Sequence, residues 1–432
     1  MKSIIRSLRH RNFRLYFFGQ GFSVTGTWMQ SVAMGWLVYR LTGSKALLGL
    51  AGFASQILTF VVAPFAGVLA DRWNRRHTII AAQALAMAQA MALAFVTLTG
   101  VVQVWHVIAL SVFTGLVRGF EVPTRQSFIV QMLDDPADLP NAIALNSFLV
   151  NTARLIGPII AGAVIMLVGE KGEGVVFLIN GASYGTILVA LVAMRVTPLR
   201  REPAGNVLAG LKEGFLYAWR TPTIRSVLML LALTSLVAIP YATLLPAFAK
   251  DADILAGGPH TLGFLMGATG VGALTAGILL AHRRSAAPLG RVLTGGAIFF
   301  GLGLVTFAAI AWALRSLALS LAALVWVGLA MTAQIYASNT LLQTTSDENK
   351  RGRVMSLYTM AFMGVIPFGA ILLGALAEIL DARFAVLGPL YEGIGAPAVV
   401  AGGGVILVVG AIFLSRRLPE HVRPLTPTLD GD

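Results

Sequence analysis

The sequence contains no cysteine, which excludes disulfide bonds and thiolate metal sites. It is also poor in charge, because Asp, Glu, Lys and Arg make up 12% of its 432 residues, against roughly 25% in soluble proteins. Hydrophobic residues make up 57% of the chain, and its mean hydropathy is +0.80. One aqueous core cannot absorb that much apolar surface, so the composition predicts a membrane protein.

The motifs of common catalytic and nucleotide-binding sites are missing too. No G-x-x-x-x-G-K-[ST] sequence occurs, since GEKGEG at 169–174 lacks the required spacing, and this argues against an ATP-driven pump. The chain has no HExxH metal motif and no GxSxG nucleophile elbow, and its six histidines are scattered. We therefore expect neither an enzyme nor a protein that carries a cofactor or a metal ion.

Long uncharged runs account for most of the chain. A helix that crosses a bilayer needs about 20 apolar residues, and charge clusters and Gly/Pro turns divide the runs into about twelve such segments. The predicted spans are 15–39, 46–70, 78–98, 105–124, 142–168, 175–194, 226–249, 261–281, 292–313, 317–342, 354–380 and 395–414. The first run lacks a signal-peptide cleavage site, so we expect it to be retained. The predicted fold class is an all-α membrane protein with twelve transmembrane helices.

The net charge of +13 comes from basic residues with a biased distribution. Of the 32 Lys and Arg, 24 fall in the two terminal segments and in alternate loops between the spans, whereas the other loops hold six. This positive-inside pattern predicts a multi-pass protein with both termini in the cytoplasm. The basic residues thus indicate topology and contact with the lipid bilayer rather than with nucleic acid. We expect a monomer in a plasma membrane, the inner membrane of a bacterium.

Several residues recur at a fixed distance, which indicates two related halves. Three pairs are each separated by 212 residues, close to half of the chain: Gln131 and Gln343, Gly157 and Gly369, and Gly162 and Gly374. The prediction is an N-terminal six-helix half at 1–196, a cytoplasmic linker at 197–222 and a pseudo-symmetric C-terminal six-helix half at 223–432. Helical spacing of apolar residues in 206–220 favours an amphipathic surface helix in the linker. Repeated halves around a midplane site are typical of secondary transporters.

The stretch GVLADRWNRR at 67–76 resembles the loop signature of the major facilitator superfamily. The matching residues are Gly67, Leu69, Ala70, Asp71, Arg72, Arg75 and Arg76. Asn74 replaces the glycine of the signature, and we expect it to adopt the left-handed turn that glycine favours. The resemblance implies that Gly67, Asp71, Arg72, Arg75 and Arg76 gate transport. In the outward-facing state the carboxylate of Asp71 would bind at the start of the eleventh span, near 353–356, as a latch.

A second resemblance lies in the fifth span. Small residues between Ala144 and Gly162 follow the spacing of the superfamily's antiporter signature, with Ala in place of Gly at three positions. Small residues allow close helix packing and Pro158 bends the span, so the resemblance implies that Gly157 and Pro158 are gating elements of an exporter. The text of 121–162 is similar to the secretion-effector branch of the superfamily, which includes siderophore exporters and multidrug efflux proteins.

Charged residues occur inside the predicted spans. Arg118, Glu121 and Arg125 occupy positions i, i+3 and i+7 of the fourth span, so they share one helix face. Such charges line a cavity or pair with one another, and two interpretations stay open: Glu121 couples transport to protons, or the three residues form a static ion pair. The superfamily often carries an arginine implicated in proton transfer where Arg118 stands. For Arg154 in the fifth span we favour a gate partner or an interfacial anchor over a substrate ligand.

Polar and amphipathic residues in the spans supply the candidates for a substrate cavity. The candidates are Trp28, Gln30, Gln56, Asn146 and Tyr336. Each such residue is by itself more often helix-packing material than a ligand. For Glu378, late in the eleventh span, a role in a periplasmic gate and a plain position at a helix end stay equally open.

The leading prediction is a proton-coupled antiporter that exports hydrophobic or amphipathic small molecules, such as siderophores or drugs, by alternating access. A translocator of lipids or lysolipids, or an importer of small molecules, is the alternative on the same fold. A membrane receptor or scaffold that binds its ligand without moving it is a more distant alternative.

Overall fold

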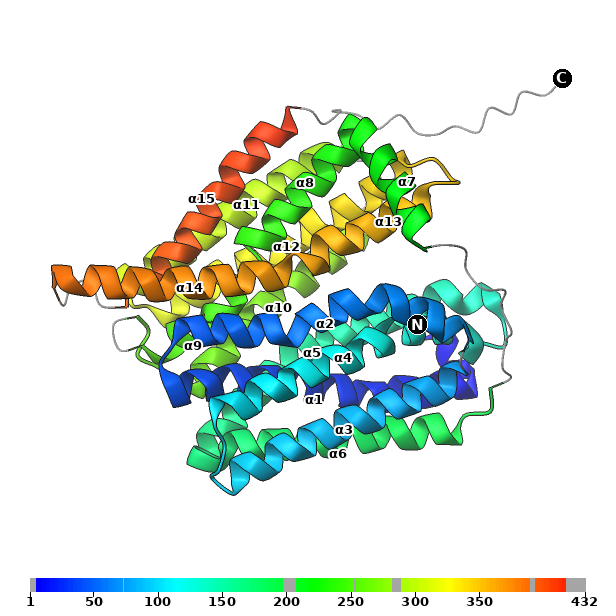
Figure 1. The fold of residues 1–432 in the computed structure, drawn as a ribbon, viewed down its shortest axis with the longest axis horizontal. Coiled ribbons are helices and arrows are strands. Elements are labelled where there is room, and N and C mark those ends of the chain that lie inside the picture. Colours follow the sequence, from blue (N-terminus) through cyan, green and yellow to red (C-terminus); the bar gives the residue numbers. More distant parts are fainter. Residues whose placement is uncertain are drawn as a thin grey trace.

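The computed structural model describes residues 5–72, 74–196, 207–251, 254–281, 289–388 and 393–416. Within these ranges it describes all side chains except those at 63–72, 127, 207–212 and 281. Every regular element in the described ranges is a helix, as Figure 1 shows. The predicted all-α fold class is confirmed.

Six long helices form the N-terminal half. They are α1 (Arg11–Thr42), α2 (Lys45–Arg72), α3 (Arg75–Leu98), α4 (Val104–Phe128), α5 (Leu139–Val168) and α6 (Gly172–Ala193). Their ends differ from those of the predicted spans by about four residues or fewer, the usual uncertainty of helix boundaries. Gly43 ends α1 in the left-handed conformation, with φ of 63°, and this allows the chain to reverse directly into α2.

The C-terminal half also has six spans, but two of them are interrupted. The seventh span consists of α8 (Pro222–Val237) and α9 (Tyr241–Lys250), and the eleventh of α13 (Arg351–Thr359), a π-helical turn (Met360–Gly364) and α14 (Ile366–Phe384). The continuous spans are α10 (Pro259–Ala281), α11 (Leu289–Ala309), α12 (Leu317–Thr345) and α15 (Gly395–Ser415). Pro240 and Pro367 stand at the interruptions, where proline lacks a backbone N–H and crowds the preceding turn.

Hydropathy agrees with this arrangement. Ten stretches of the described chain are long and apolar enough to cross a bilayer, and one of them, Pro136–Ala193, contains both α5 and α6. The helix α1, which carries Arg11, Arg14 and Arg40, lies outside the ten. Counting α5 and α6 separately and adding α1 gives twelve spans, as predicted. Six of them come before and six after the short helix α7 (Val207–Arg220).

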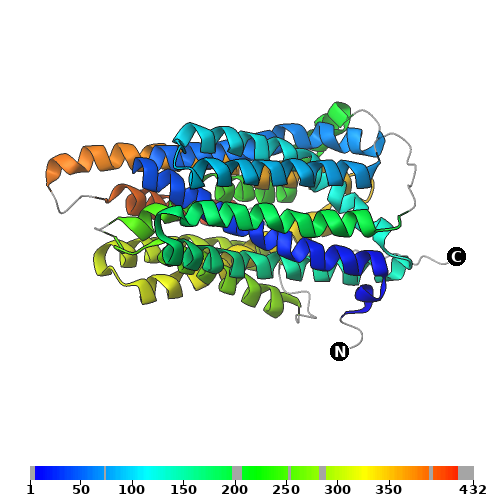
Figure 2. The ribbon, with the colours of Figure 1, turned by 90° about the horizontal axis from the view of Figure 1, so that it is seen from below.

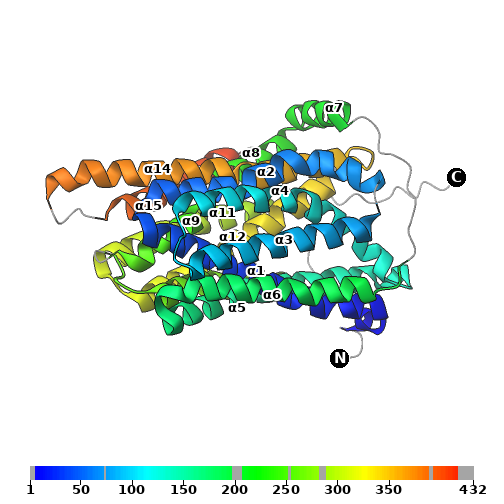
Figure 3. The same cartoon turned by 60° about the horizontal axis from the view of Figure 1, so that its bottom comes forward.

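The two halves lie side by side, and most of their helices run along the long axis of the molecule (Figures 1 and 2). The start of α1, the end of α6 and the whole of α7 lie at the same end of the bundle (Figure 3). We call this the basic end, because four arginines fall within 6–14 there. The opposite end is the one where α1 ends and α2 begins.

The internal repeat corresponds to matched helix contacts within each half. A Cβ atom on Gly157 of α5 would lie 2.7 Å from Cβ of Trp28 on α1. Its counterpart Gly369, on α14, would place a Cβ 2.2 Å from the carbonyl oxygen of Leu236 on α8. Real Cβ atoms do not approach other atoms so closely, so the fifth span of each half packs on the first through a glycine.

A second matched pair of glycines joins the two halves to each other. A Cβ atom on Gly162 of α5 would lie 2.6 Å from the carbonyl oxygen of Pro259, at the start of α10. A Cβ atom on Gly374 of α14 would lie at the same distance from the carbonyl oxygen of Lys45, at the start of α2. Both contacts lie toward the opposite end of the bundle, so the halves are in closest contact there.

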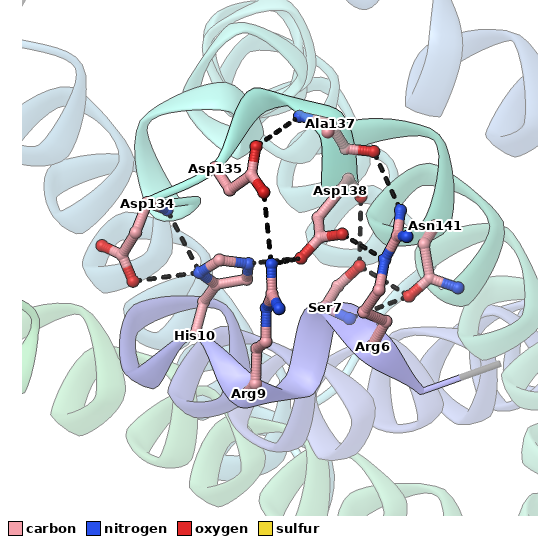
Figure 4. A network of polar contacts seen from close by, with 9 residues as sticks. All are labelled: Arg6, Ser7, Arg9, His10, Asp134, Asp135, Ala137, Asp138 and Asn141. Carbon is pink, nitrogen blue, oxygen red and sulfur yellow. Dashed lines mark hydrogen bonds and ion pairs between the residues drawn. The ribbon is translucent and has the colours of Figure 1, made fainter. Parts of the chain in front are cut away.

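A short 3₁₀ helix before α1 docks on the loop between α4 and α5 (Figure 4). The imidazole of His10 lies between two carboxylates, with Nε2 2.7 Å from Oδ2 of Asp138 and Nδ1 2.9 Å from Oδ2 of Asp134. Arg6 and Arg9 also form ion pairs with Asp138, which is fully buried. We call these five residues the N-terminal strap.

The strap shifts the pKa values of its two central groups. Burial by itself would lower the pKa of His10, but the hydrogen bonds and charges of Asp134 and Asp138 outweigh it and raise that pKa. The hydrogen bond from His10 and the charges of Arg6 and Arg9 lower the pKa of Asp138. Both shifts favour the ion pair of charged His10 with charged Asp138.

The C-terminal half has a corresponding contact. The backbone N–H of Asp347, which is 212 residues from Asp135, donates a hydrogen bond of 3.2 Å to the hydroxyl of Tyr217 on α7. Glu213 of α7 forms an ion pair with Arg353 of α13, and Nζ of Lys350 lies 4.7 Å from the ring centroid of Tyr217. In each half, therefore, a short helix before the first span docks on the loop between the fourth and fifth spans.

The N-terminal strap predicts a pH-dependent stability. The contribution of His10 is complete below its unfolded pKa of about 6.5 and is lost as pH rises through its raised folded pKa. Asp138 contributes above its unfolded pKa of about 3.9 and loses that contribution as pH falls. We expect His10→Gln to lower Tm by about 2–4 °C at pH 6, and by much less at pH 9.

Thermal unfolding of the purified protein between pH 5 and pH 9 measures this difference. His77→Gln is the matched control, because His77 is exposed and also lies at the basic end, at the start of α3. A Tm difference between wild type and His10→Gln that stays constant across this range would contradict the assignment.

Candidate functional site

A cavity of about 580 Å³ lies between the two halves. Half of the residues on its N-terminal wall are apolar or glycine, and the polar half consists of Gln20, Ser23, Thr27, Gln30, Ser31, Ser55, Gln56, Gln83, Thr114, Arg118, Glu121, Arg125 and Tyr184. The C-terminal half contributes Ala242, Thr243, Pro246, Leu262, Met266 and Met363. The two walls therefore differ in chemistry, with all three charged residues on one side and a nearly apolar surface on the other.

The three charged residues of α4 all line this cavity, as expected from their shared helix face. Glu121 pairs with Arg125 one turn later, with 3.0 Å between Oε1 and Nε. Nε2 of Gln83 on α3 donates a weaker hydrogen bond of 3.3 Å to the same carboxylate oxygen. Within the described residues, Arg118 has no carboxylate partner. The wall thus holds one acid–base pair and one further cation.

Two of the predicted cavity residues lie on the wall of α1. Trp28 and Gln30 both line the cavity. Gln30 is also part of a buried chain of amides, in which Nδ2 of Asn180 donates to Oε1 of Gln30 (2.7 Å) and Nε2 of Gln30 donates to Oε1 of Gln89 (3.0 Å). Since this chain links α1, α3 and α6, Gln30 holds the N-terminal half together as well as facing the cavity.

The other three candidates are distributed differently. Gln56 of α2 lines the same cavity. Asn146 of α5 lines a second cavity of about 290 Å³ and accepts a hydrogen bond of 3.1 Å from the hydroxyl of Tyr16. Arg125 and Val150 line both cavities, so the second adjoins the first.

Tyr336 of α12 is not brought to either cavity. It is 45% exposed and lies outside the lining residues of both. The reason is the orientation of α12, which turns Gln334 and Ser338 into the C-terminal half, where Nε2 of Gln334 donates to the hydroxyl of Thr234 (2.6 Å). Tyr336 is two positions from both Gln334 and Ser338, so its side chain points to the other side of the helix.

The loop between α2 and α3 is described in part. Gly67, Asp71 and Arg72 belong to the last turns of α2, and their side chains lie outside the described part of the structure. Arg75 is buried, and the guanidinium of Arg76 donates to the carbonyl oxygens of Leu191 and Val192 at the end of α6, at 2.9 and 2.8 Å. In this arrangement Arg76 therefore satisfies helix-end carbonyls inside the N-terminal half.

The prediction that Asn74 adopts a left-handed turn is wrong. Asn74 has φ of −67° and ψ of 110°, which is extended backbone. Its side chain caps α3 instead, because Oδ1 accepts hydrogen bonds from the backbone N–H groups of Arg76 and His77. Asparagine is therefore favoured here as a helix N-cap and not as a substitute for glycine.

Gly157 and Pro158 lie on α5 where this helix packs against α1 of its own half and against α10 of the other half. Gly157 contacts Trp28 of α1, as described above, and the carbonyl oxygen of Pro158 would lie 2.5 Å from a Cβ on Gly263 of α10. The pair thus borders both a contact inside the N-terminal half and a contact between the halves. Such a position is suited to a helix that pivots on its neighbour.

Polar contacts close the opposite end of the bundle. The ammonium of Lys45, whose side chain is 6% exposed, pairs with two carboxylates of the C-terminal half, Asp381 and, at 3.1 Å, Asp251. The hydroxyl of Tyr39 donates a hydrogen bond of 2.6 Å to Asp251 as well. A buried lysine is stable only with such partners, so this network binds the two halves firmly at this end.

Glu378 belongs to the same closure. Its Oε2 accepts hydrogen bonds from the backbone N–H groups of Lys45 (2.6 Å) and Ala46 (3.2 Å) at the N-terminus of α2. A carboxylate there satisfies helix-end donors and is favoured by the helix dipole. We call Tyr39, Lys45, Asp251, Glu378 and Asp381 the latch. Together these contacts join the first and second spans to the seventh and eleventh.

Comparison with known proteins decides the family. The family model described as transmembrane secretion effector matches residues 2–419. The chain belongs to this family, a branch of the major facilitator superfamily. It is therefore a secondary transporter of the major facilitator fold and a multi-pass membrane protein rather than an enzyme, in agreement with the resemblance found in 121–162.

Two curated relatives have names that describe efflux. The chain is 26% identical over 368 residues to the multidrug efflux pump Tap of Mycolicibacterium fortuitum, covering 82% of this chain and 86% of that one. It is 26% identical over 412 residues to the enterobactin exporter EntS of Shigella boydii, covering 94% and 91%. Both alignments cover more than four fifths of each chain.

Solved structures confirm the fold. A bacterial homologue of the human lysosomal transporter Spinster, in an inward-facing and unoccupied conformation, superimposes with a TM-score of 0.74 at 16% identity. The match covers 96% of this chain and 99% of that one. At this identity the likeness defines the fold alone, and with it the two pseudo-symmetric six-helix halves.

Sequence reasoning missed most of the latch and the cavity residue Gln83. Lys45 and Asp251 stand at predicted helix ends, where charges are ordinary, and no repeat or spacing connects them. Only Glu378 carried a signal, because an acid late in a span is unusual. The partners of these residues are set by how the halves meet, which local sequence does not encode.

Breaking the latch should open the opposite end. We expect Lys45→Met to raise the population with separated halves by at least about tenfold, because removing one partner of a buried ion pair costs more than the ~1.4 kcal/mol that a tenfold shift requires. Spin labels at Leu41→Cys and Ala382→Cys, both exposed at this end, report the separation by pulsed electron resonance. The chain has no native cysteine to interfere.

Lys171→Met is the control, since Lys171 is exposed at the same end and belongs to the turn between α5 and α6. It should leave the distance distribution unchanged. An unchanged distribution in Lys45→Met would show that the latch does not hold the halves together.

Proposed function

We propose that the protein is a proton-coupled exporter of hydrophobic or amphipathic small molecules, such as siderophores or drugs, in a bacterial inner membrane. The observation that carries this proposal is the two-sided cavity, with Glu121 and its arginine neighbours on one wall and an apolar surface on the other. An amphipathic molecule matches both walls at once. The names of the relatives, an efflux pump and a siderophore exporter, support the same direction of transport.

The arrangement of the halves supports alternating access. The latch and the glycine contacts gather at the opposite end, which the charge distribution predicts to be periplasmic. On this proposal the structure is an inward-facing state, and substrate enters from the cytoplasm through the second cavity. Release outward requires the latch to open and the basic end to close.

Asp71 is the proposed latch of the outward-facing state. When the basic end closes, its carboxylate would bind the N-terminus of α13, as the family signature implies. The two latches are then alternatives, because each joins the halves at a different end. Gly157 and Pro158 provide the pivot between them.

Glu121 is the proposed proton-coupling group, with Arg118 beside it. Glu121 lines the cavity and pairs with Arg125, with 3.0 Å between Oε1 and Nε. A substrate that donates a hydrogen bond to Glu121 would compete with a proton for this carboxylate. Proton and substrate would then bind Glu121 in alternation, which an antiporter requires.

Proteoliposomes containing the purified protein test this proposal. A proton gradient is imposed, and siderophores, dyes and lysolipids are added one by one while a pH-sensitive dye records proton flux. We expect at least one compound to dissipate the gradient, and Glu121→Gln to lower that flux by about tenfold or more. Glu170→Gln is the control, because Glu170 is exposed in the turn after α5.

Flux in Glu121→Gln equal to wild type would exclude Glu121 as the coupling group. A response to lysolipids alone would replace the proposal with lipid translocation. Movement of a compound in the same direction as the protons, rather than in the opposite direction, would indicate an importer.

Asp71→Asn tests the gate separately. We expect normal insertion and thermal stability but transport reduced by about tenfold, because the outward-facing state loses its latch. Uptake into proteoliposomes and the Tm of the purified variant provide the two measurements. Transport at the wild-type rate would exclude the gating role.

A further inference from the structure

Arg154 lies near the middle of a membrane-spanning helix and has no acidic partner among the residues that the structure describes. It lies close to the centre of the 30 residues of α5. Among the described residues no carboxylate pairs with it, and its contact is with the face of Trp28, where Cζ lies 5.6 Å from the ring centroid. A cation–π contact offsets only part of the cost of placing a charge inside a span. The remaining cost is a reason to look for an anion from outside the chain.

The described residues of the C-terminal half do not supply that anion. Among them, the hydroxyl of Tyr241 interacts with Arg154, and this hydroxyl already shares a hydrogen bond of 3.0 Å with Thr269. Position 366, the counterpart of Arg154 in the internal repeat, is Ile366. The cation thus belongs to one half only and has no symmetric structural role.

Arg154 lines neither cavity itself, but two of its neighbours do. Val150, one turn before it on the same helix face, lines both cavities, and Trp28 beneath its guanidinium lines the larger one. Arg118 adds a second cation without a carboxylate partner in the described residues, whereas Glu121 is already paired with Arg125. The polar wall therefore carries an excess of positive charge next to an indole ring.

We propose that Arg154 and Trp28 form a subsite for the anionic group of the substrate, a carboxylate or a similar oxyanion on an aromatic or aliphatic body. The guanidinium binds the oxyanion in a charge-assisted manner, and the indole stacks on the adjoining apolar carbons. The rest of the molecule lies against Leu262, Met266 and Met363 of the other wall. This inference rests on the proposed transport function and narrows its substrates to amphipathic anions.

A matched pair of fluorescent probes tests the subsite. Dansylglycine and dansylglycinamide differ in one group, a carboxylate or an uncharged amide, and dansyl fluorescence rises in an apolar site. In nanodiscs containing the full-length protein, with empty nanodiscs subtracted, we expect dansylglycine to bind about tenfold more tightly than the amide. Arg154→Gln should reduce that preference to about twofold or less, because it weakens the binding of dansylglycine and not that of dansylglycinamide. Arg154→Lys should retain part of the preference.

Arg14→Gln is the matched control, because Arg14 is an exposed arginine at the basic end of α1, outside both cavities. Equal binding of the two probes by wild type, or no binding of dansylglycine, would overturn the subsite. Equal weakening of both probes in Arg154→Gln would also overturn it, since that result indicates a structural role.

Transport of the same probes separates this inference from the proposed function. If dansylglycine binds with the expected preference but never moves across proteoliposomes, the subsite stands and the transport proposal fails. If wild type and Arg154→Gln both transport dansylglycinamide as fast as dansylglycine, the transporter stands and the anion subsite falls.

Discussion

The structure depends on how a chain with few charges places them in a low-dielectric environment. A charge inside a span must be paired or must face a water-filled cavity. Lys45 meets this requirement by pairing with Asp251 and Asp381 at one end of the bundle, and Glu121 by pairing with Arg125 in the central cavity. The first pairing joins the two halves and the second borders the cavity between them, so the constraint that stabilises the fold also acts where the proposed alternating access requires movement.

Glycine would allow the proposed movement at the level of the backbone. Gly162 and Gly374 bring α5 against α10 and α14 against α2 without intervening side chains, and the two contacts are related by the internal repeat. Interfaces made of backbone have little interdigitation, so helices can tilt over them without repacking a core. The ion pairs of the latch then supply the stability that these smooth contacts lack.

Sequence reasoning recovered features with a period or a composition, such as the twelve spans, the halves and the charged face of α4. It failed where the answer depends on which helices meet. Asn74 was expected to replace a glycine but caps α3, and Tyr336 points away from both cavities because Gln334 and Ser338 take the inner face of α12. Lys45 and Asp381 are 336 residues apart, and only the association of the halves makes them partners.

For Arg154 the structure favours a role in substrate binding over the gate partner or anchor that the sequence suggests. From sequence alone, an arginine in the fifth span is most simply a gate partner or an anchor that extends to the interface. Both roles need a carboxylate or a headgroup close by, yet its contact is with Trp28 at the edge of the cavity. Lys45 is paired with two acidic residues, whereas Arg154 has no acidic partner in the described chain. The proposed anionic substrate therefore explains the charge of Arg154 better than the described residues do.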